Sequence, residues 1–126
     1  MSLCKRLIAR LDVKGTRLIK GIRFEGLKVM GDSCEAAINY YQKGVDEILY
    51  IDSVASLYGR NSLTEILKTT SKRIFIPITA GGGIRCVKDA AKLLSAGADK
   101  VAVNTSCIEN PHLITDLVNE FGSQCV

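Results

Sequence analysis

Short apolar runs recur along the chain, separated by turn residues or by segments with helical spacing. Adjacent apolar residues predict strands at positions 6–13, 47–52, 74–80 and 100–104, and the start of a fifth strand at 123–126. Because the apolar residues are consecutive rather than alternating, the runs are typical of parallel strands covered on both faces. The pattern therefore indicates an α/β fold.

Between the strands, apolar residues recur at the spacing of one helix face. The expected helices span positions 32–43, 61–72, 85–96 and 111–121. Asp32 is expected to cap the first helix, and Asn61 or Ser62 the second. Gly44 and Gly97 are expected to end the first and third helices. The predicted order is four strand–helix units followed by the beginning of a fifth strand.

Two similar segments stand 53 positions apart, Gly44-Val45-Asp46-Glu47 and Gly97-Ala98-Asp99-Lys100. In each segment the glycine ends a helix, and an aspartate and a charged residue then lead into a strand. This similarity indicates a repeated unit of two strand–helix pairs. Later strands start about every 25 residues, close to the spacing of a (β/α)₈ TIM barrel, which needs roughly 250 residues. We therefore expect one domain at 1–126 that forms half of such a barrel: four βα units and the start of strand five. A doubly wound open sheet is the alternative.

Composition and charge narrow the function classes. The 126 residues are 47% hydrophobic and 24% charged, which excludes a disordered chain. Seventeen basic and thirteen acidic residues give a net charge of +4, but the basic residues are scattered, so no nucleic-acid partner is expected. Apolar runs of four or five residues predict no membrane span and no signal peptide, so the expected location is cytoplasmic. Five widely spaced cysteines and a single histidine predict reduced thiols and no metal site.

Polar residues gather where the predicted strands end, which is the edge that carries the site in parallel α/β folds. Asp12 is expected to end the first strand, and Asp52 the second. A carboxylate among apolar side chains can serve as a general acid or base, or it can hydrogen-bond loop amides. The spacing alone leaves both roles open.

The segment Gly81-Gly82-Gly83 follows the third strand and precedes a helix, and Asn104-Thr105 follows the fourth. Glycines let the backbone approach an anion, and a helix N-terminus offers free N–H groups. The two segments together predict a phosphate pocket, and a tight strand-to-helix turn is the alternative. At the opposite edge, Arg6, Glu47 and Lys100 begin strands, which by itself indicates a solvated rim of charges.

These motifs, in this order and spacing, resemble one family. The matching stretches are Leu11-Asp-Val13, Val29-Met-Gly-Asp32, Gly81-Gly-Gly-Ile-Arg85, Ala96-Gly-Ala-Asp-Lys100, Val103-Asn-Thr105, Glu109-Asn-Pro111 and Phe121-Gly-Ser-Gln-Cys125. The chain resembles the cyclase subunit of imidazole glycerol phosphate synthase, the HisF family of histidine biosynthesis. A related isomerase of that pathway shares Gly-Gly-Gly-Ile-Arg but usually has glycine at the position of Asn104, so the resemblance favours the cyclase.

The resemblance implies an enzyme of the lyase or cyclase type without a cofactor or a metal. Such a barrel receives ammonia from a glutaminase subunit at its bottom and acts on a bisphosphorylated aminoimidazole-carboxamide ribonucleotide, giving imidazole glycerol phosphate and AICAR. It implies that Asp12 is catalytic and that Lys20 and Asp52 bind substrate. The implied phosphate site is Gly82, Gly83, Asn104 and Thr105, and the implied ammonia gate is Arg6, Glu47 and Lys100.

Three departures from the family pattern touch the face expected to carry the site. Arg10 stands where the family has a small residue, Gly15-Thr16 replaces Asp-Gly, and Ser53-Val54 follows Asp52 where Ile-Thr is common. They keep two alternatives open: a paralogue in glutamine-dependent amidation of a sugar, and a non-catalytic phosphate-binding subunit. A half barrel exposes sheet edges and core, so self-association is also expected.

Overall fold

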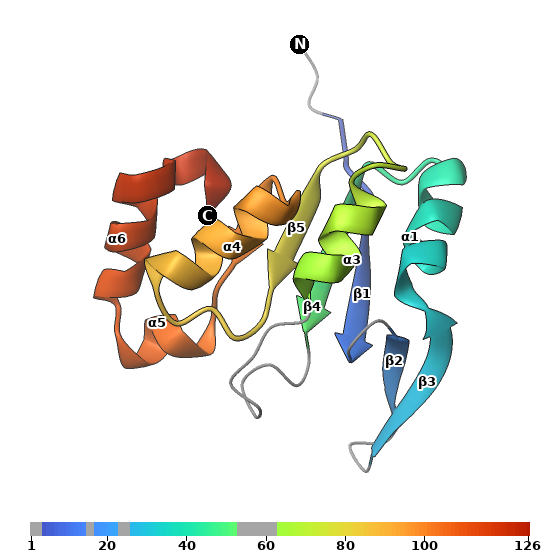
Figure 1. Ribbon diagram of the computed structural model, residues 1–126, viewed down its shortest axis with the longest axis horizontal. Helices are drawn as coiled ribbons and strands as arrows, with labels where there is room; N and C mark the ends of the chain where they lie inside the picture. The colour runs from blue at the N-terminus through green and yellow to red at the C-terminus, as the bar shows by residue number, and fades with distance from the viewer. Residues whose placement is uncertain (1–3, 15–16, 23–25, 53–62) are drawn as a thin grey trace.

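A computed structural model describes residues 4–14, 17–22, 26–52 and 63–126, and the side chains of residues 17 and 20–30 lie outside its described part. One six-stranded sheet has the order β3-β2-β1-β4-β5-β6 (Figure 1). The strands are β1 (Ile8–Lys14), β2 (Arg17–Ile22), β3 (Gly26–Asp32), β4 (Glu47–Asp52), β5 (Ile78–Gly81) and β6 (Lys100–Ala102). The pairs β1–β4, β4–β5 and β5–β6 are parallel, which confirms the expected parallel sheet.

The helices are α1 (Ser33–Gln42), α3 (Leu63–Thr70), α4 (Val87–Ala96), α5 (Thr105–Glu109) and α6 (His112–Phe121), followed by the 3₁₀ helix η1 (Ser123–Cys125). Asp32 caps α1 as predicted, because its carboxylate accepts a hydrogen bond from the Glu35 N–H at 2.9 Å. The expected caps Asn61 and Ser62 lie outside the described residues. No helix among the described ranges is long and apolar enough to cross a membrane.

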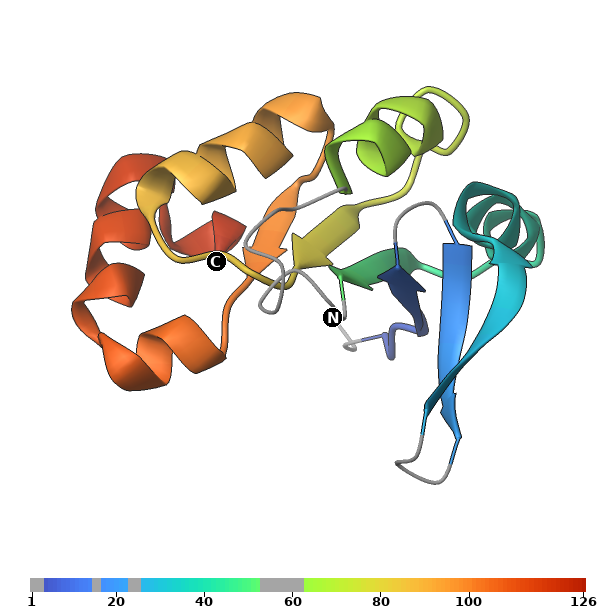
Figure 2. The ribbon, with the colours of Figure 1, turned by 60° about the horizontal axis from the view of Figure 1, so that its bottom comes forward.

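The two faces of the parallel sheet differ. Ile48 and Tyr50 of β4, with Leu11 and Val13 of β1, are buried against α1, α3 and α4, and this is the core. The intervening positions point to the opposite side, where Ile8 and Arg10 are exposed. Figure 2 shows α1, α3 and α4 together on one side of the sheet. We call the other side the inner face, lined in register by Ile8, Arg10, Asp12, Glu47, Leu49, Ile51, Thr79, Gly81, Lys100 and Ala102.

The region between the first strand and the first helix is structured, which the apolar pattern did not predict. Strands β2 and β3 form an antiparallel hairpin beside β1, with a register shift between Leu18 and Ile19. Only Val13 and Lys14 of β1 pair with β2. The hairpin therefore extends past the carboxyl end of β1 (Figure 2).

Several predicted strand boundaries were wrong, including the first strand, which was predicted at 6–13 and is observed at 8–14. The run at 74–80 becomes a strand only from Ile78, because Pro77 has no N–H and Phe75 is 82% exposed rather than packed. The run at 100–104 ends as a strand at Ala102. The expected start of strand five at 123–126 is the 3₁₀ helix η1, in which the Cys125 N–H bonds the Gly122 carbonyl at 3.2 Å. That local bond takes the place of a strand ladder.

The repeated segments adopt the same local structure. Asp46 donates its backbone N–H to the Leu7 carbonyl at 2.9 Å, and its carboxylate accepts from the Leu7 N–H at 2.7 Å. Asp99 makes the same pair of bonds with Ile78, both at 2.8 Å. Each aspartate thus ties the start of one parallel strand to the start of the preceding one, in agreement with the predicted repeat.

Candidate functional site

Asp12 lies on the inner face near the carboxyl end of β1. The strand continues to Lys14, so Asp12 does not end it as predicted. Its carboxylate is 38% exposed, and its register neighbour Ile51 is apolar. Arg10, two residues earlier on the same face, donates from Nε and Nη2 to Asp12 Oδ1 at 3.2 and 3.1 Å. A charged pair therefore stands where the sequence predicted a lone carboxylate.

Asp52 does not join Asp12. It ends β4 as predicted, but it pairs in register with Val13, a fully buried core residue. Asp52 itself is 4% exposed. The structure places it toward the helix-covered side of the sheet, so its contact with a substrate stays a prediction without support from this geometry.

The two predicted phosphate-binding segments lie at the same edge of the sheet. Gly81 pairs in register with Ala102, so Gly82 and Gly83 leave β5 beside the end of β6. Gly82 has φ +100°, and a Cβ there would lie 2.4 Å from the Asp52 carbonyl oxygen. A side chain at position 82 is therefore excluded on two grounds.

The helix geometry at this edge differs from the prediction. The glycines do not open α4 directly, because α4 starts at Val87 and Cys86 is its N-cap. Asn104 is the N-cap of the five-residue helix α5, and Thr105 is its first residue; both are exposed. Helix α5 was not predicted, because five residues are too few to show a helical period. Donors from two adjacent strand ends are brought together, and phosphate binding stays a prediction.

Lys20 lies on β2, where its backbone pairs with Lys28. Its side chain lies outside the described part of the structure, as do Gly15, Thr16, Ser53 and Val54. The expected role of Lys20 in substrate binding is therefore neither supported nor opposed by a contact.

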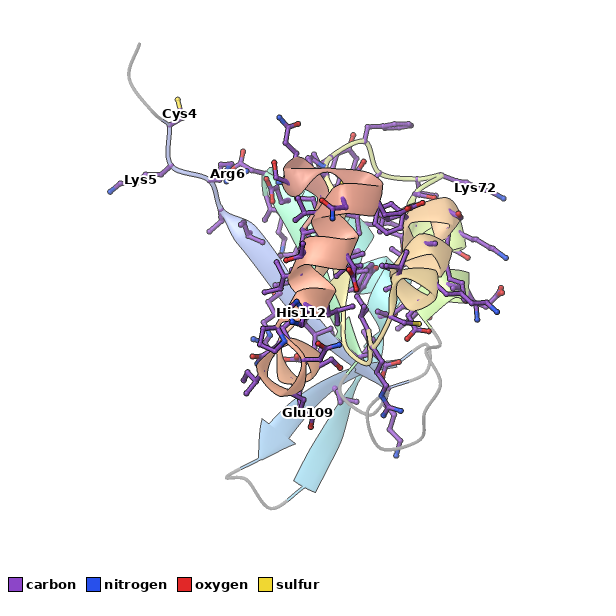
Figure 3. All side chains as sticks on the ribbon, turned by 90° about the vertical axis from the view of Figure 1, so that its left-hand side faces the viewer. Cys4, Lys5, Arg6, Lys72, Glu109 and His112 are labelled. Carbon is purple, nitrogen blue, oxygen red and sulfur yellow. The ribbon has the colours of Figure 1, made fainter. Side chains whose placement is uncertain are left out.

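The opposite edge holds a charge cluster that the structure does assemble. Glu47 is 6% exposed and forms an ion pair with Arg6, while Lys100 Nζ lies 3.9 Å from Glu47 Oε1. A buried carboxylate needs such partners, since an isolated charge is costly to remove from water. Figure 3 places Arg6 at the end of the molecule away from Glu109 of α5. The cluster therefore lies at the amino edge of the strands, away from Asp12.

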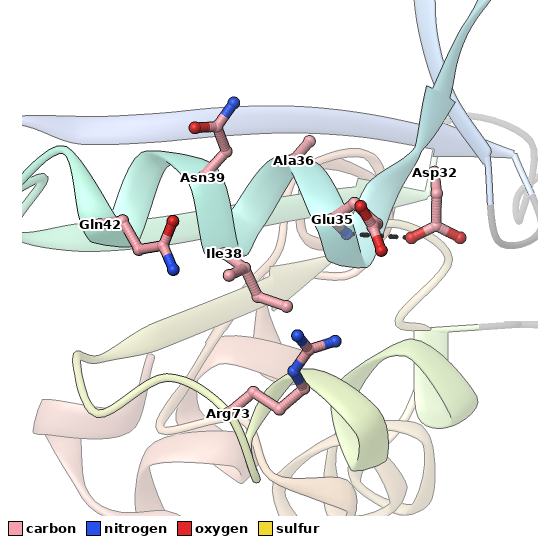
Figure 4. A pocket seen from close by; sticks show the side chains of 7 residues that line it. All are labelled: Asp32, Glu35, Ala36, Ile38, Asn39, Gln42 and Arg73. Carbon is pink, nitrogen blue, oxygen red and sulfur yellow. Dashed lines mark hydrogen bonds between the residues drawn. The ribbon is translucent and has the colours of Figure 1, made fainter.

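A hollow of about 450 Å³ lies on the helix side of the sheet. It is separate from the Arg10–Asp12 pair and from the cluster of Arg6, Glu47 and Lys100. Figure 4 shows Arg73 facing α1 there, with Asp32 and Glu35 at the first turn of that helix. None of the predicted site residues lines it. Within the described ranges no group of three or more His, Cys, Asp or Glu is placed to hold a metal ion, and the five cysteines are free.

Comparison with known proteins assigns the family. The family model "Histidine biosynthesis protein" matches residues 6–126. The chain belongs to this family. The family has the (β/α)₈ barrel fold, so the predicted fold class is confirmed.

The curated relatives are subunits of one synthase. The chain is 62% identical over 121 residues to "Imidazole glycerol phosphate synthase subunit HisF" of Legionella pneumophila, covering 96% of this chain and 57% of the relative. It is 50% identical over 126 residues to the protein of that name from Methanopyrus kandleri, covering all of this chain and 46% of the relative. The chain thus spans about half the length of the curated relatives it matches, and the predicted resemblance to the HisF family is confirmed.

Sequence reasoning singled out Arg10 only as a departure and missed its contact with Asp12. The signal was available: residues i and i+2 of a strand share a face, and here they carry opposite charges. The same spacing could have shown that Asp52 faces away from Asp12 once the register was known.

Proposed function

We propose that this chain forms the amino-terminal half of a barrel that acts as the cyclase subunit of an imidazole glycerol phosphate synthase. The observation that carries the proposal is the 62% identity to a HisF subunit over 96% of this chain. The reaction would join ammonia to a bisphosphorylated aminoimidazole-carboxamide ribonucleotide and release imidazole glycerol phosphate and AICAR. It places the protein in histidine biosynthesis, in the cytoplasm.

Asp12 is the proposed proton-transfer group. It is a carboxylate on the inner face, beside the apolar Ile51 and the charged Arg10, near the carboxyl end of its strand, where barrel active sites lie. Its partial exposure leaves it accessible to a substrate bound above the sheet. A positioned carboxylate contributes on the order of 10²–10⁴-fold to such a reaction.

One phosphate group of the substrate is assigned to the edge formed by Gly82, Gly83, Asn104 and Thr105. The support is that Gly82 and Gly83 leave β5 beside the end of β6, close in the chain to the exposed Thr105 hydroxyl, which can donate to a phosphate oxygen. Lys20 is assigned to the same substrate, on the hairpin beside the carboxyl end of β1.

Arg6, Glu47 and Lys100 are proposed to guard the entry of ammonia, supplied by a glutaminase subunit docked at the amino edge. The support is the assembled cluster itself: one nearly buried carboxylate with cations from β6 and from the segment before β1. It lies on the same sheet face as Asp12, so a route along that face joins the two.

Glutamine-dependent amidation of a sugar by a barrel of this family is the second candidate. The observation that favours it is the ion pair of Arg10 with Asp12, at a position where the HisF family usually has a small residue. A changed partner for the central carboxylate is the kind of difference that a changed substrate would require.

The test uses the full-length protein with its glutaminase partner, assayed with glutamine and separately with ammonium salt. Asp12→Asn keeps the shape of the side chain but cannot exchange the proton, so both activities should fall at least 10²-fold by the usual size of acid–base catalysis. Lys100→Met should lower the glutamine-dependent rate and spare the ammonium-dependent rate, because ammonium salt supplies ammonia from solvent.

Three results would contradict these assignments. Near-wild-type turnover of Asp12→Asn would remove Asp12 from catalysis. An unchanged ratio of the two rates in Lys100→Met, with the partner still bound, would return the cluster to a structural role. Wild-type protein that is inactive on the ribonucleotide but amidates a sugar would select the second candidate.

A further inference from the structure

Arg10 is the described residue that engages the Asp12 carboxylate. Both side chains rise from β1 on the inner face, and the two guanidinium nitrogens Nε and Nη2 converge on the single oxygen Oδ1 at 3.2 and 3.1 Å. Arg10 donates both of these hydrogen bonds to Oδ1 and none to Oδ2. The contact therefore separates the two carboxylate oxygens: one is held by the protein, and the other is not engaged by Arg10.

The surroundings of the pair make this contact the main constraint on the carboxylate within the described residues. Arg10 has Leu49 as its register neighbour, and Asp12 has Ile51. These side chains pack but cannot orient a carboxylate by hydrogen bonds. Arg10 is 62% exposed, so in this structure water screens the pair. The pair would strengthen once a substrate or further protein covered the inner face, because the local dielectric would fall.

A guanidinium suits this task better than an ammonium. Its donors lie in a rigid plane, so two of them that converge on Oδ1 hold this oxygen near the plane of the guanidinium group. A lysine at position 10 would supply the same charge as a single flexible point.

We propose that Arg10 is a positioning residue for Asp12, holding Oδ1 so that Oδ2 faces the substrate for proton exchange. This inference rests on the proposed function, in which Asp12 transfers the proton.

The test measures the ammonium-dependent rate of the full-length protein in Arg10→Ala and Arg10→Lys variants. Arg10→Ala should lower kcat by about 10–100-fold, the usual effect of a misplaced catalytic group, and change KM little. Arg10→Lys should fall between Arg10→Ala and wild type. Free guanidinium ion at non-denaturing concentration should restore part of the lost kcat in Arg10→Ala, which no loss of folding stability would allow.

Arg73→Ala is the matched control, because Arg73 is an exposed arginine on the helix side, away from the inner face. Its kcat should equal that of wild type, and guanidinium should not raise it. A wild-type kcat in Arg10→Ala, or a loss in a folded variant that guanidinium does not reduce, would overturn the inference and leave the proposed function standing. If Arg10→Ala does not fold, Arg10→Lys decides, and a wild-type kcat there overturns the inference.

Failure of the proposed function gives a different result: the wild-type protein itself would not turn over the ribonucleotide with ammonium salt. Arg10 would then have no positioning role in that reaction. The contact is then tested by the carboxyl-carbon NMR signal of Asp12. A signal that differs between wild type and Arg10→Ala supports the contact, and identical signals refute it.

Discussion

At the residue scale, Tyr50 shows how a polar group is accommodated in the core. It is fully buried, and its hydroxyl donates to the Ser33 carbonyl at 3.3 Å and lies 3.0 Å from Thr70 Oγ1. Because the Tyr50 hydrogen goes to Ser33, the Thr70 hydroxyl can donate to Tyr50. Thr70 is also fully buried, so this small network links α1, β4 and α3 inside the apolar core.

Tyr50→Phe should lower the free energy of unfolding by about 1–3 kcal/mol, because Thr70 and the Ser33 carbonyl lose a buried partner. Tyr40→Phe, at a 43% exposed tyrosine, is the control and should change stability by less than about 0.5 kcal/mol. Urea denaturation followed by circular dichroism gives both values. Equal values for the two variants would show that the network contributes nothing.

The same side chain predicts a pH dependence at alkaline pH. Burial raises the pKa of Tyr50 above its ordinary value of 10.0. The folded protein therefore keeps the proton where the unfolded chain loses it, so the contribution is complete below about pH 10 and declines as pH rises further. In Tyr50→Phe this decline should be shallower than in wild type, as measured by unfolding curves between pH 8 and about 11. Parallel curves would contradict the assignment.

At the element scale, the sequence predicted the strands and helices that have a regular apolar pattern. It missed the hairpin, whose strands form through pairing with each other. Strand β4 was predicted at its observed bounds, because six apolar-rich residues lie between two clear breaks. The hairpin of β2 and β3 was missed, since Gly21 and Gly26 break its apolar pattern, and its strands form through pairing with each other. Strand β5 was predicted too long, because an apolar run does not reveal that Phe75 points to solvent.

Asp46 and Asp99, which make equivalent hydrogen bonds between strand starts, should contribute different amounts to the stability of the fold. The Ile78 N–H to Asp99 bond is partly buried, whereas the Leu7 N–H to Asp46 bond is exposed. Asp99→Ala leaves a partly buried N–H without its partner and should cost about 1–3 kcal/mol. Asp46→Ala should cost less, because water can replace the lost carboxylate. A larger loss in Asp46→Ala, measured by denaturant unfolding, would contradict this account.

At the scale of the whole molecule, the fold class could be predicted and the location of the site only in part. The parallel pairing of β1, β4, β5 and β6 follows from repeated apolar runs, and the charge cluster at Glu47 follows from strand starts that share an edge. Which face a strand-end residue takes depends on register. Asp12 and Asp52 therefore looked equivalent in sequence, yet they lie on opposite sides of the sheet.

The difference between the two faces gives the last prediction, on neighbouring residues of β4. Ile48 is fully buried under the helices, whereas Leu49 is on the inner face between Arg10 and Thr79 in register. A glutamate at position 48 would bury an unpaired charge and should unfold the 126-residue chain, seen as loss of its circular dichroism signal. Leu49→Glu places the carboxylate on the partly open face beside a cation and should keep the fold.

Leu49→Glu should also weaken self-association of the 126-residue chain, because a charge then interrupts the apolar part of the inner face. Sedimentation velocity over a range of concentrations measures this directly. Lys92→Glu, at an exposed position on the outer helix α4, lowers the net charge by two where Leu49→Glu lowers it by one, and so controls for the change in net charge. Two results would show that the inner face is not the surface through which copies meet. In the first, Leu49→Glu unfolds like Ile48→Glu. In the second, Leu49→Glu associates as wild type does while Lys92→Glu does not.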